Sequence, residues 1–216
     1  MRREAISRVI EAYDDRVIRA YSRARFLILR QRFLDEIGQY LPPAGDVLDL
    51  GCGFGLFSLY FAQLQPGARF RGIDLDARRI GIARAAARRL GLRNVEYAVG
   101  DARRFRADRE HAGAYMLDIV HHVPPPAVEP LLVELHRGLA AGARLIVKDV
   151  DSRPAYKRWF TYVLDRLVSP GSPPHYWPAE ALQAVLERVG FQVHRHLMVD
   201  VLPYPHVLYV CRKAPG

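Results

Sequence analysis

Apolar and polar positions follow two alternating patterns between residues 47 and 150. Short apolar runs of strand length end in polar residues or glycine, and longer segments with apolar side chains at helical spacing lie between them. The expected strands cover residues 47–50, 70–75, 95–99, 114–119 and 144–150. The expected helices cover residues 56–65, 77–90 and 124–139. This alternation predicts an α/β fold, with a parallel sheet covered by helices on both faces.

A basic helical pattern precedes this region, over residues 4–40, with a break expected near residues 13–15. The apolar positions form two adjoining stripes, which are Val17, Tyr21, Ala24 and Ile28, and then Phe26, Leu29, Phe33 and Ile37. Arginines lie largely on the other side, at Arg16, Arg19, Arg23, Arg30 and Arg32. Such a segment packs on the domain with a solvated arginine face, covers a substrate pocket or rests on a membrane.

The regular alternation ends after residue 150. Residues 151–178 are irregular and rich in aromatic side chains, and a helix over 179–189 and strands over 191–199 and 206–211 follow. We expect one domain over residues 1–216. Its expected parts are an N-terminal helical lid or extension (1–41), a core (46–150), an insertion (151–178) and a C-terminal helix with two strands (179–216).

The charge balance of the 216 residues is strongly basic, with 32 lysines and arginines, 23 acidic residues and a net charge of +9. Such a field favours nucleic acid, an anionic membrane surface or an acidic substrate, and does not choose among them. No apolar run approaches the ~18 residues that would span a bilayer, and the N-terminus does not resemble a signal peptide. We therefore expect a cytoplasmic protein.

The two cysteines, Cys52 and Cys211, fit a reducing compartment. Their spacing provides neither a disulfide framework nor a set of metal ligands, so the sequence predicts no metal site.

The most informative motif is the glycine turn that follows the first strand, with Gly51, Gly53 and Gly55 on alternate positions. Glycine allows a ligand to approach the backbone closely, and the next helix directs its N-terminal amides toward the turn. The dinucleotide fingerprint G-x-G-x-x-G would need glycine at position 56, where the chain has Leu56. The pattern is G-x-G-x-G instead.

With Asp49 two residues before the first glycine, this stretch resembles motif I of the class I S-adenosylmethionine-dependent methyltransferases of the small-molecule type. The resemblance implies a Rossmann-like fold, with a mostly parallel sheet of about seven strands whose last strand is antiparallel. It also implies that Gly51, Cys52, Gly53 and Gly55 lie under S-adenosylmethionine, and that Asp49 lies near its ammonium group.

Three further positions extend the resemblance, each at the end of an expected strand. Asp74, with Leu75, matches the acidic position that binds the ribose, about twenty residues after the glycine turn. Asp101 and Ala102 resemble the third motif, which contacts the adenine, and Asp118 resembles the fourth. Aspartates after strands also serve as helix caps or turn residues.

Methyl transfer is an in-line displacement, so positioning of the two reactants contributes most, roughly 7–11 kcal/mol. A general base is optional and adds about 10²–10⁴-fold. If the acceptor is a hydroxyl or a carboxylic acid, His121 or His122, beside Asp118 after the fourth strand, could take its proton. The alternative is that the two histidines have a structural role in that turn.

Aromatic residues of the irregular segment are candidates for the acceptor pocket, namely Tyr156, Trp159, His175, Tyr176 and Trp177. Aromatic side chains also fill protein cores. The sequence therefore predicts a methyltransferase acting on a small-molecule or lipid-like acceptor, at oxygen, with possible membrane contact through the basic N-terminal helix. The alternatives left open are an RNA or DNA methyltransferase and a non-catalytic S-adenosylmethionine-binding module.

Overall fold

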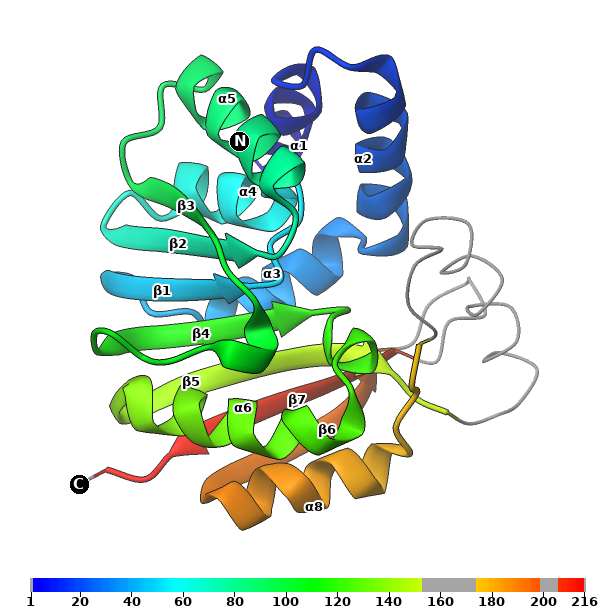
Figure 1. The fold of residues 1–216 in the computed structure, drawn as a ribbon. Helices are drawn as coiled ribbons and strands as arrows, with labels where there is room; N and C mark the ends of the chain where they lie inside the picture. Colours follow the sequence, from blue (N-terminus) through cyan, green and yellow to red (C-terminus); the bar gives the residue numbers. More distant parts are fainter. Residues whose placement is uncertain (1, 153–173, 199–205, 216) are drawn as a thin grey trace. The chain divides into compact units, whose positions relative to one another are not determined.

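The computed structural model describes residues 2–152, 174–198 and 206–215 (Figure 1). Seven strands form one sheet in the order β3-β2-β1-β4-β5-β7-β6. Their bounds are β1 Gly45–Leu50, β2 Ala68–Asp74, β3 Val95–Val99, β4 His111–Leu117, β5 Leu139–Val150, β6 Phe191–Met198 and β7 His206–Lys213. Strands β1, β2 and β3 pair in parallel, whereas β7 runs antiparallel to both β5 and β6. The expected fold, a mostly parallel doubly wound sheet with an antiparallel last strand, is confirmed.

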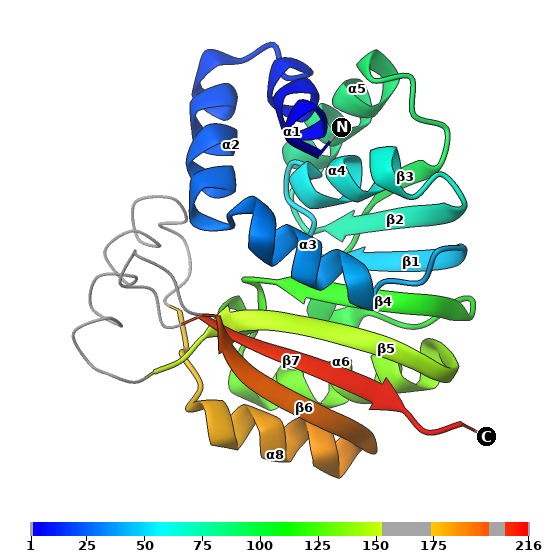
Figure 2. The same ribbon diagram turned by 180° about the vertical axis from the view of Figure 1, so that it is seen from behind.

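The chain divides into two compact units, and each is described by itself. The first contains residues up to Ala102 together with His111–Ala114, and the second contains Arg103–Glu110 and the chain from Tyr115 onward. The helices of the first unit are α1 Arg2–Glu11, α2 Arg16–Ile28, α3 Gln31–Tyr40, α4 Leu56–Leu64 and α5 Ala77–Arg89. Figure 2 shows α3 and α4 on the same side of β1 and β2.

Helix α4 forms the core of the first unit because nearly its whole surface is apolar and buried. Phe61 of α4 stacks on Phe70 of β2 at a ring separation of 6.4 Å. On its other side Phe61 packs against Gly38 of α3, where a Cβ would lie only 3.3 Å from the ring. The sheet and the N-terminal helices therefore share one apolar core in this unit.

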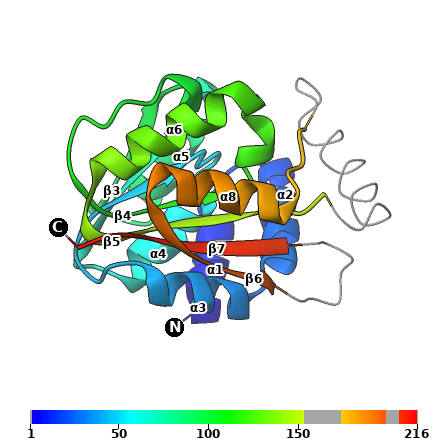
Figure 3. The same cartoon turned by 90° about the horizontal axis from the view of Figure 1, so that it is seen from below.

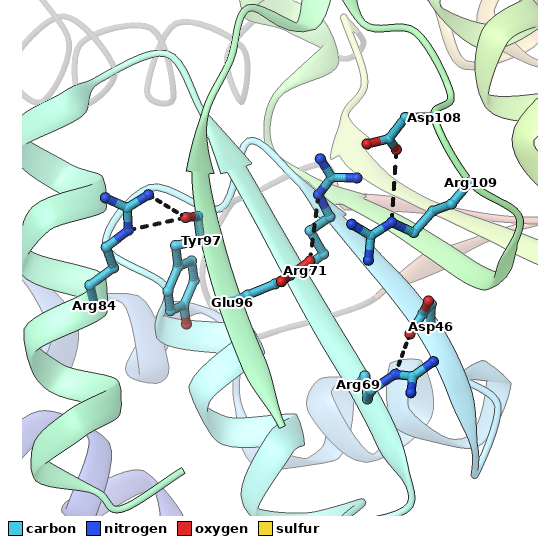
Figure 4. A network of polar contacts seen from close by, with 8 residues as sticks. All are labelled: Asp46, Arg69, Arg71, Arg84, Glu96, Tyr97, Asp108 and Arg109. Atoms are coloured by element: carbon cyan, nitrogen blue, oxygen red, sulfur yellow. Dashed lines mark hydrogen bonds and ion pairs between the residues drawn. The ribbon is translucent and has the colours of Figure 1, made fainter. Parts of the chain in front are cut away.

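Polar side-chain contacts join neighbouring parallel strands of the first unit (Figure 4). Arg69 pairs with Asp46 at 2.6 Å, between β2 and β1, and Arg71 lies 3.8 Å from Glu96, between β2 and β3. Ion pairs with exposed members contribute little to stability. They do show that several arginines are matched by carboxylates within the domain.

The N-terminal region differs from its prediction in two ways. It is broken a second time, at Leu29 and Arg30, between α2 and α3. The stripe expected to start at Val17 is also not the buried face of α2, because Val17 is 76% exposed and Ala24 is exposed. The helix instead buries Ile18, Ser22 and Phe26, since Phe26 packs against two aromatic rings of α4.

The second unit contains β5, β7 and β6 with helices α6 (Pro125–Gly138) and α8 (Ala179–Val189). Figure 3 shows α6 and α8 side by side along one face of these strands. Both helices bury leucine and valine side chains toward the sheet, as their spacing predicts. Strand β5 begins directly after α6, five residues earlier than expected, and passes through Gly142 at a φ of +73°.

Candidate functional site

The glycine turn lies between β1 and α4 of the first unit. Its three glycines all have left-handed backbone conformations, with φ of +80° at Gly51, +55° at Gly53 and +79° at Gly55. L side chains rarely adopt such angles, so the turn needs glycine at each position. The amides of Gly51 and Cys52 both donate to the carbonyl of Ile73, at 2.7 and 3.1 Å. These bonds attach the turn to the end of β2.

Tyr97 of β3 packs against this turn. The sequence pattern does not predict this contact. A Cβ at Gly55 would lie 2.5 Å from the Tyr97 hydroxyl, which is itself 3.0 Å from the Ser58 hydroxyl. The Tyr97 carbonyl accepts two hydrogen bonds from Arg84 of α5, at 3.1 and 2.6 Å (Figure 4). Burial raises the pKa of the Tyr97 phenol well above its usual range, so the phenol stays neutral.

The backbone of Gly53, in the middle of the turn, is open on the side that a Cβ would occupy. No atom comes within 4 Å of the position that a Cβ would take at Gly53. The Gly53 amide donates to Oδ2 of Asp74 at 2.8 Å, and the Asp76 amide donates to Oδ1 of the same carboxylate at 3.0 Å. The structure therefore brings the glycine turn and Asp74 together, and it holds the carboxylate in one orientation.

The remaining cofactor candidates of this unit lie in β1 or shortly after β2 and β3. Asp49 is buried in β1, and the side chain of Leu75 is exposed just after β2. Gly100, directly before Asp101, donates its amide to the carbonyl of Asp74 at 3.0 Å. Asp101 and Ala102 are half-buried where the short helix η1 (Ala102–Arg104) begins.

Cys52 is buried within the turn. Burial, and next the carboxylates of Asp49 and Asp74, raise the pKa of its thiol well above the usual range. A thiol that stays protonated is a poor nucleophile. Cys52 therefore fills space beneath the turn rather than taking part in covalent chemistry.

In the second unit, Asp118 follows β4 in a left-handed conformation, with a φ of +58°, alone among the non-glycine residues of the described ranges. Its amide donates to the carbonyl of Lys148 at 2.8 Å. The Lys148 ammonium lies 2.5 Å from the Asp118 carboxylate and is fully buried. This ion pair fixes the first residue of the connection between β4 and α6.

His121 belongs to the short helix η2 (Val120–His122) in that connection. It is bound by Asp149, which follows Lys148 in β5. Its Nδ1 lies 2.5 Å from Oδ1 of Asp149, and its amide donates to Oδ2 at 3.1 Å. Both side chains are buried. Asp149 was not among the predicted site residues, although a Lys-Asp pair directly after the aliphatic run of residues 145–147 is a signal that could have identified it.

Two of the predicted acceptor residues, His175 and Tyr176, contact His121, and a third, Trp177, contacts His175. The His121 carbonyl accepts from the His175 amide at 2.7 Å, and the His121 ring lies 5.4 Å from that of Tyr176. The His122 ring is 4.1 Å away, and His175 packs edge-on against Trp177 at 5.4 Å. Two other predicted residues, Tyr156 and Trp159, lie outside the described residues. We call His121, His122, Asp149 and Tyr176 the histidine cluster.

Comparison with known proteins agrees with this geometry. A family profile described as "Methyltransferase domain" matches residues 47–142, which include the glycine turn, Asp74, Asp101 and Asp118. Residues 47–142 are thus similar to a methyltransferase domain, in agreement with the resemblance to the class I S-adenosylmethionine-dependent methyltransferases. The cofactor of the family is S-adenosylmethionine.

The relatives of this domain are named for different substrates. One is the ribosomal RNA small subunit methyltransferase G of Deinococcus radiodurans, 34% identical over 112 residues, covering 50% of this chain and 43% of the relative. Another is a ubiquinone biosynthesis O-methyltransferase of Xanthomonas axonopodis pv. citri, 32% identical over 127 residues, covering 56% of this chain and 50% of the relative. The chain thus spans about half the length of these relatives.

A solved structure shows the same fold. The S-adenosylmethionine-dependent methyltransferase of Methanosarcina mazei superposes with a TM-score of 0.68 at 22% identity, covering 84% of this chain and 98% of the other. In the described residues of this chain, no helix has the length and apolar character to cross a membrane.

Proposed function

We propose that this protein transfers a methyl group from S-adenosylmethionine to an oxygen atom of a small-molecule or lipid-like acceptor. The observation that carries the choice of oxygen is the buried contact between His121 and Asp149. A hydroxyl is a poor nucleophile unless its proton is removed, whereas a neutral amine needs no base to attack. A carboxylate-bound imidazole is the arrangement that removes such a proton.

The first unit supplies residues that fit the cofactor. We assign the Asp74 carboxylate, which two amides hold in one orientation, to the ribose hydroxyls, from which it would accept hydrogen bonds. The open space at Gly53 leaves room for a ligand against the backbone. Asp101 and Ala102 are assigned to the adenine edge and exposed Leu75 to its face, while buried Asp49 is assigned to the ammonium.

Within the histidine cluster, His121 is the proposed base. With Nδ1 donating to Asp149, the neutral His121 ring has Nε2 as its proton-accepting nitrogen. Asp149 is then a positioning residue that fixes the tautomer and stabilises the ring when it becomes charged. We assign to Asp118, which is held by Lys148, the role of shaping the connection that carries His121. S-adenosylmethionine supplies an electrophilic methyl group when bound.

The test is incubation of the purified protein and a methyl-labelled cofactor with cell extract, followed by mass spectrometry of the labelled products. A labelled O-methyl product that is lost in His121→Gln and retained in His122→Gln supports the proposal. His122 is the matched control because it is the adjacent imidazole and is only partly buried. A methylated nitrogen or carbon atom, or full activity of His121→Gln, contradicts it.

A second candidate is RNA methylation, which is favoured by the relative named as a ribosomal RNA methyltransferase and by the net charge of +9. This function predicts RNA binding that weakens steeply with salt, with a slope that reflects several phosphate contacts. Labelled RNA in the same experiment would select it. S-adenosylmethionine binding with no labelled product across extracts and acceptors would select a non-catalytic binding module.

A further inference from the structure

Helix α2 presents an apolar stripe to solvent. Val17 and Leu27, at 76% and 69% exposure, are the most exposed of the large apolar side chains in the described residues. Exposed Ala20 and Ala24 lie between them in the sequence. Positions 17, 20, 24 and 27 fall on one side of a helix, because their spacings of three and four residues match its turn. The stripe is about 15 Å long, at 1.5 Å per residue.

The opposite face of α2 is already buried. Ile18, Ser22 and Phe26 point into the first unit, where the Phe26 ring lies 5.9 Å from Phe57 and 6.3 Å from Tyr60 of α4. A surface helix ordinarily has one apolar face and a polar face toward water. Helix α2 is apolar on both sides, so packing among the described residues does not explain the outer stripe.

The charged residues of α2 favour an anionic partner for the stripe. Arg16 and Arg23 are exposed at the border of the stripe, and none of the thirteen residues from Arg16 to Ile28 is acidic. The carboxylate of Asp15, just before the helix, accepts hydrogen bonds from the amides of Val17 and Ile18. Arginines beside an apolar stripe match a surface with phosphate groups above hydrocarbon.

We propose that α2 docks the protein on an anionic lipid surface, with Val17 and Leu27 at the boundary between headgroups and acyl chains. Arg16 and Arg23 then lie at the level of the lipid phosphates. The apolar stripe favours lipid over RNA, because an RNA-binding surface presents cations or stacking aromatic rings rather than aliphatic side chains. This inference does not depend on the acceptor proposed above.

The test measures binding of the full chain to vesicles of phosphatidylcholine with and without phosphatidylserine, by sedimentation. We expect preferential binding to the anionic vesicles that weakens as salt is raised. Replacing Arg16 and Arg23 by glutamate should lower the partition coefficient at least about 25-fold, at about fivefold for each arginine near the surface. Val17→Asp with Leu27→Asp should lower it at least about tenfold, because apolar burial is lost.

Matched controls separate this helix from charge and hydrophobicity in general. Arg88→Glu with Arg93→Glu makes the same charge change at exposed sites outside α2, and Val133→Asp removes an exposed valine from α6. Both controls should bind as the unaltered protein does. The proposal is overturned if the control variants lose as much vesicle binding as the α2 variants, or if the protein binds neutral and anionic vesicles equally. It is also overturned if RNA displaces the vesicles from the surface formed by Val17 and Leu27. The arginine variants keep it testable if the aspartate variants fail to fold.

Discussion

The glycine turn allows a paired prediction, since Gly53 and Gly55 share a left-handed backbone but differ in surroundings. A Cβ at Gly53 would meet no atom within 4 Å, whereas one at Gly55 would lie 2.5 Å from the Tyr97 hydroxyl and 2.7 Å from its ring carbon. Gly53→Ala should therefore disturb a ligand, and Gly55→Ala should disturb the protein itself.

The magnitudes follow from three contributions. A left-handed alanine costs about 1–2 kcal/mol, and the loss of glycine freedom in the unfolded chain returns about 0.4–1 kcal/mol. Gly53→Ala should thus lower the free energy of unfolding by about 1 kcal/mol. Gly55→Ala adds an overpacking cost of about 1–3 kcal/mol against buried Tyr97, so its total loss should be about 2–4 kcal/mol.

Denaturant titration followed by circular dichroism measures the two losses, and calorimetry measures S-adenosylmethionine binding. We expect Gly53→Ala to weaken binding by at least about fivefold, because overpacking a contact costs roughly 1–3 kcal/mol. The reasoning is refuted if Gly53→Ala loses as much stability as Gly55→Ala, or if Gly53→Ala binds the cofactor as tightly as the unaltered protein.

Three further predictions concern side chains bound at the strand ends. Asp74→Ala should weaken S-adenosylmethionine binding by on the order of 1–3 kcal/mol, because charge-assisted hydrogen bonds are lost, and equal affinity by calorimetry would remove Asp74 from the site. Asp149→Asn should lower the turnover number by about 10²–10⁴-fold and change its pH profile, with cofactor affinity unchanged, whereas a purely structural role would leave the pH profile in place. Lys148→Met should lower the free energy of unfolding by up to about 3–5 kcal/mol, because it leaves the Asp118 carboxylate, which is only 12% exposed, without the Lys148 ammonium. Adding Asp118→Asn should recover part of that loss, and no recovery in the double variant would contradict this account.

Local signals were sufficient for much of the fold. The predicted bounds of β3 and α8 coincide with those observed. Helix α8 ends where Gly190 adopts a φ of +111°, and α5 begins where the Asp76 carboxylate accepts from two amides, as its position predicts. Caps and glycine turns act within a few residues, so the sequence displays them directly.

Contacts between distant segments explain what the sequence did not reveal. The spacing of α2 was consistent with two stripes, and only the packing of Phe26 on α4 decides which face is buried. Asp149 binds His121 across 28 positions of the chain, and Tyr97 supports Gly55 across 42. Neither partner can be identified from residues close to it in sequence.

The opposite charges of the adjacent residues Lys148 and Asp149 also constrain how β5 is aligned with Asp118 and His121. The preceding residues, Leu145 to Val147, are aliphatic, and such a run would tolerate several alignments. If β5 slipped by one residue, Asp149 would take the place of Lys148 beside the Asp118 carboxylate, or Lys148 would replace Asp149 beside His121. Either error would bury mismatched charges, so these two residues act as an electrostatic check that selects one alignment during folding.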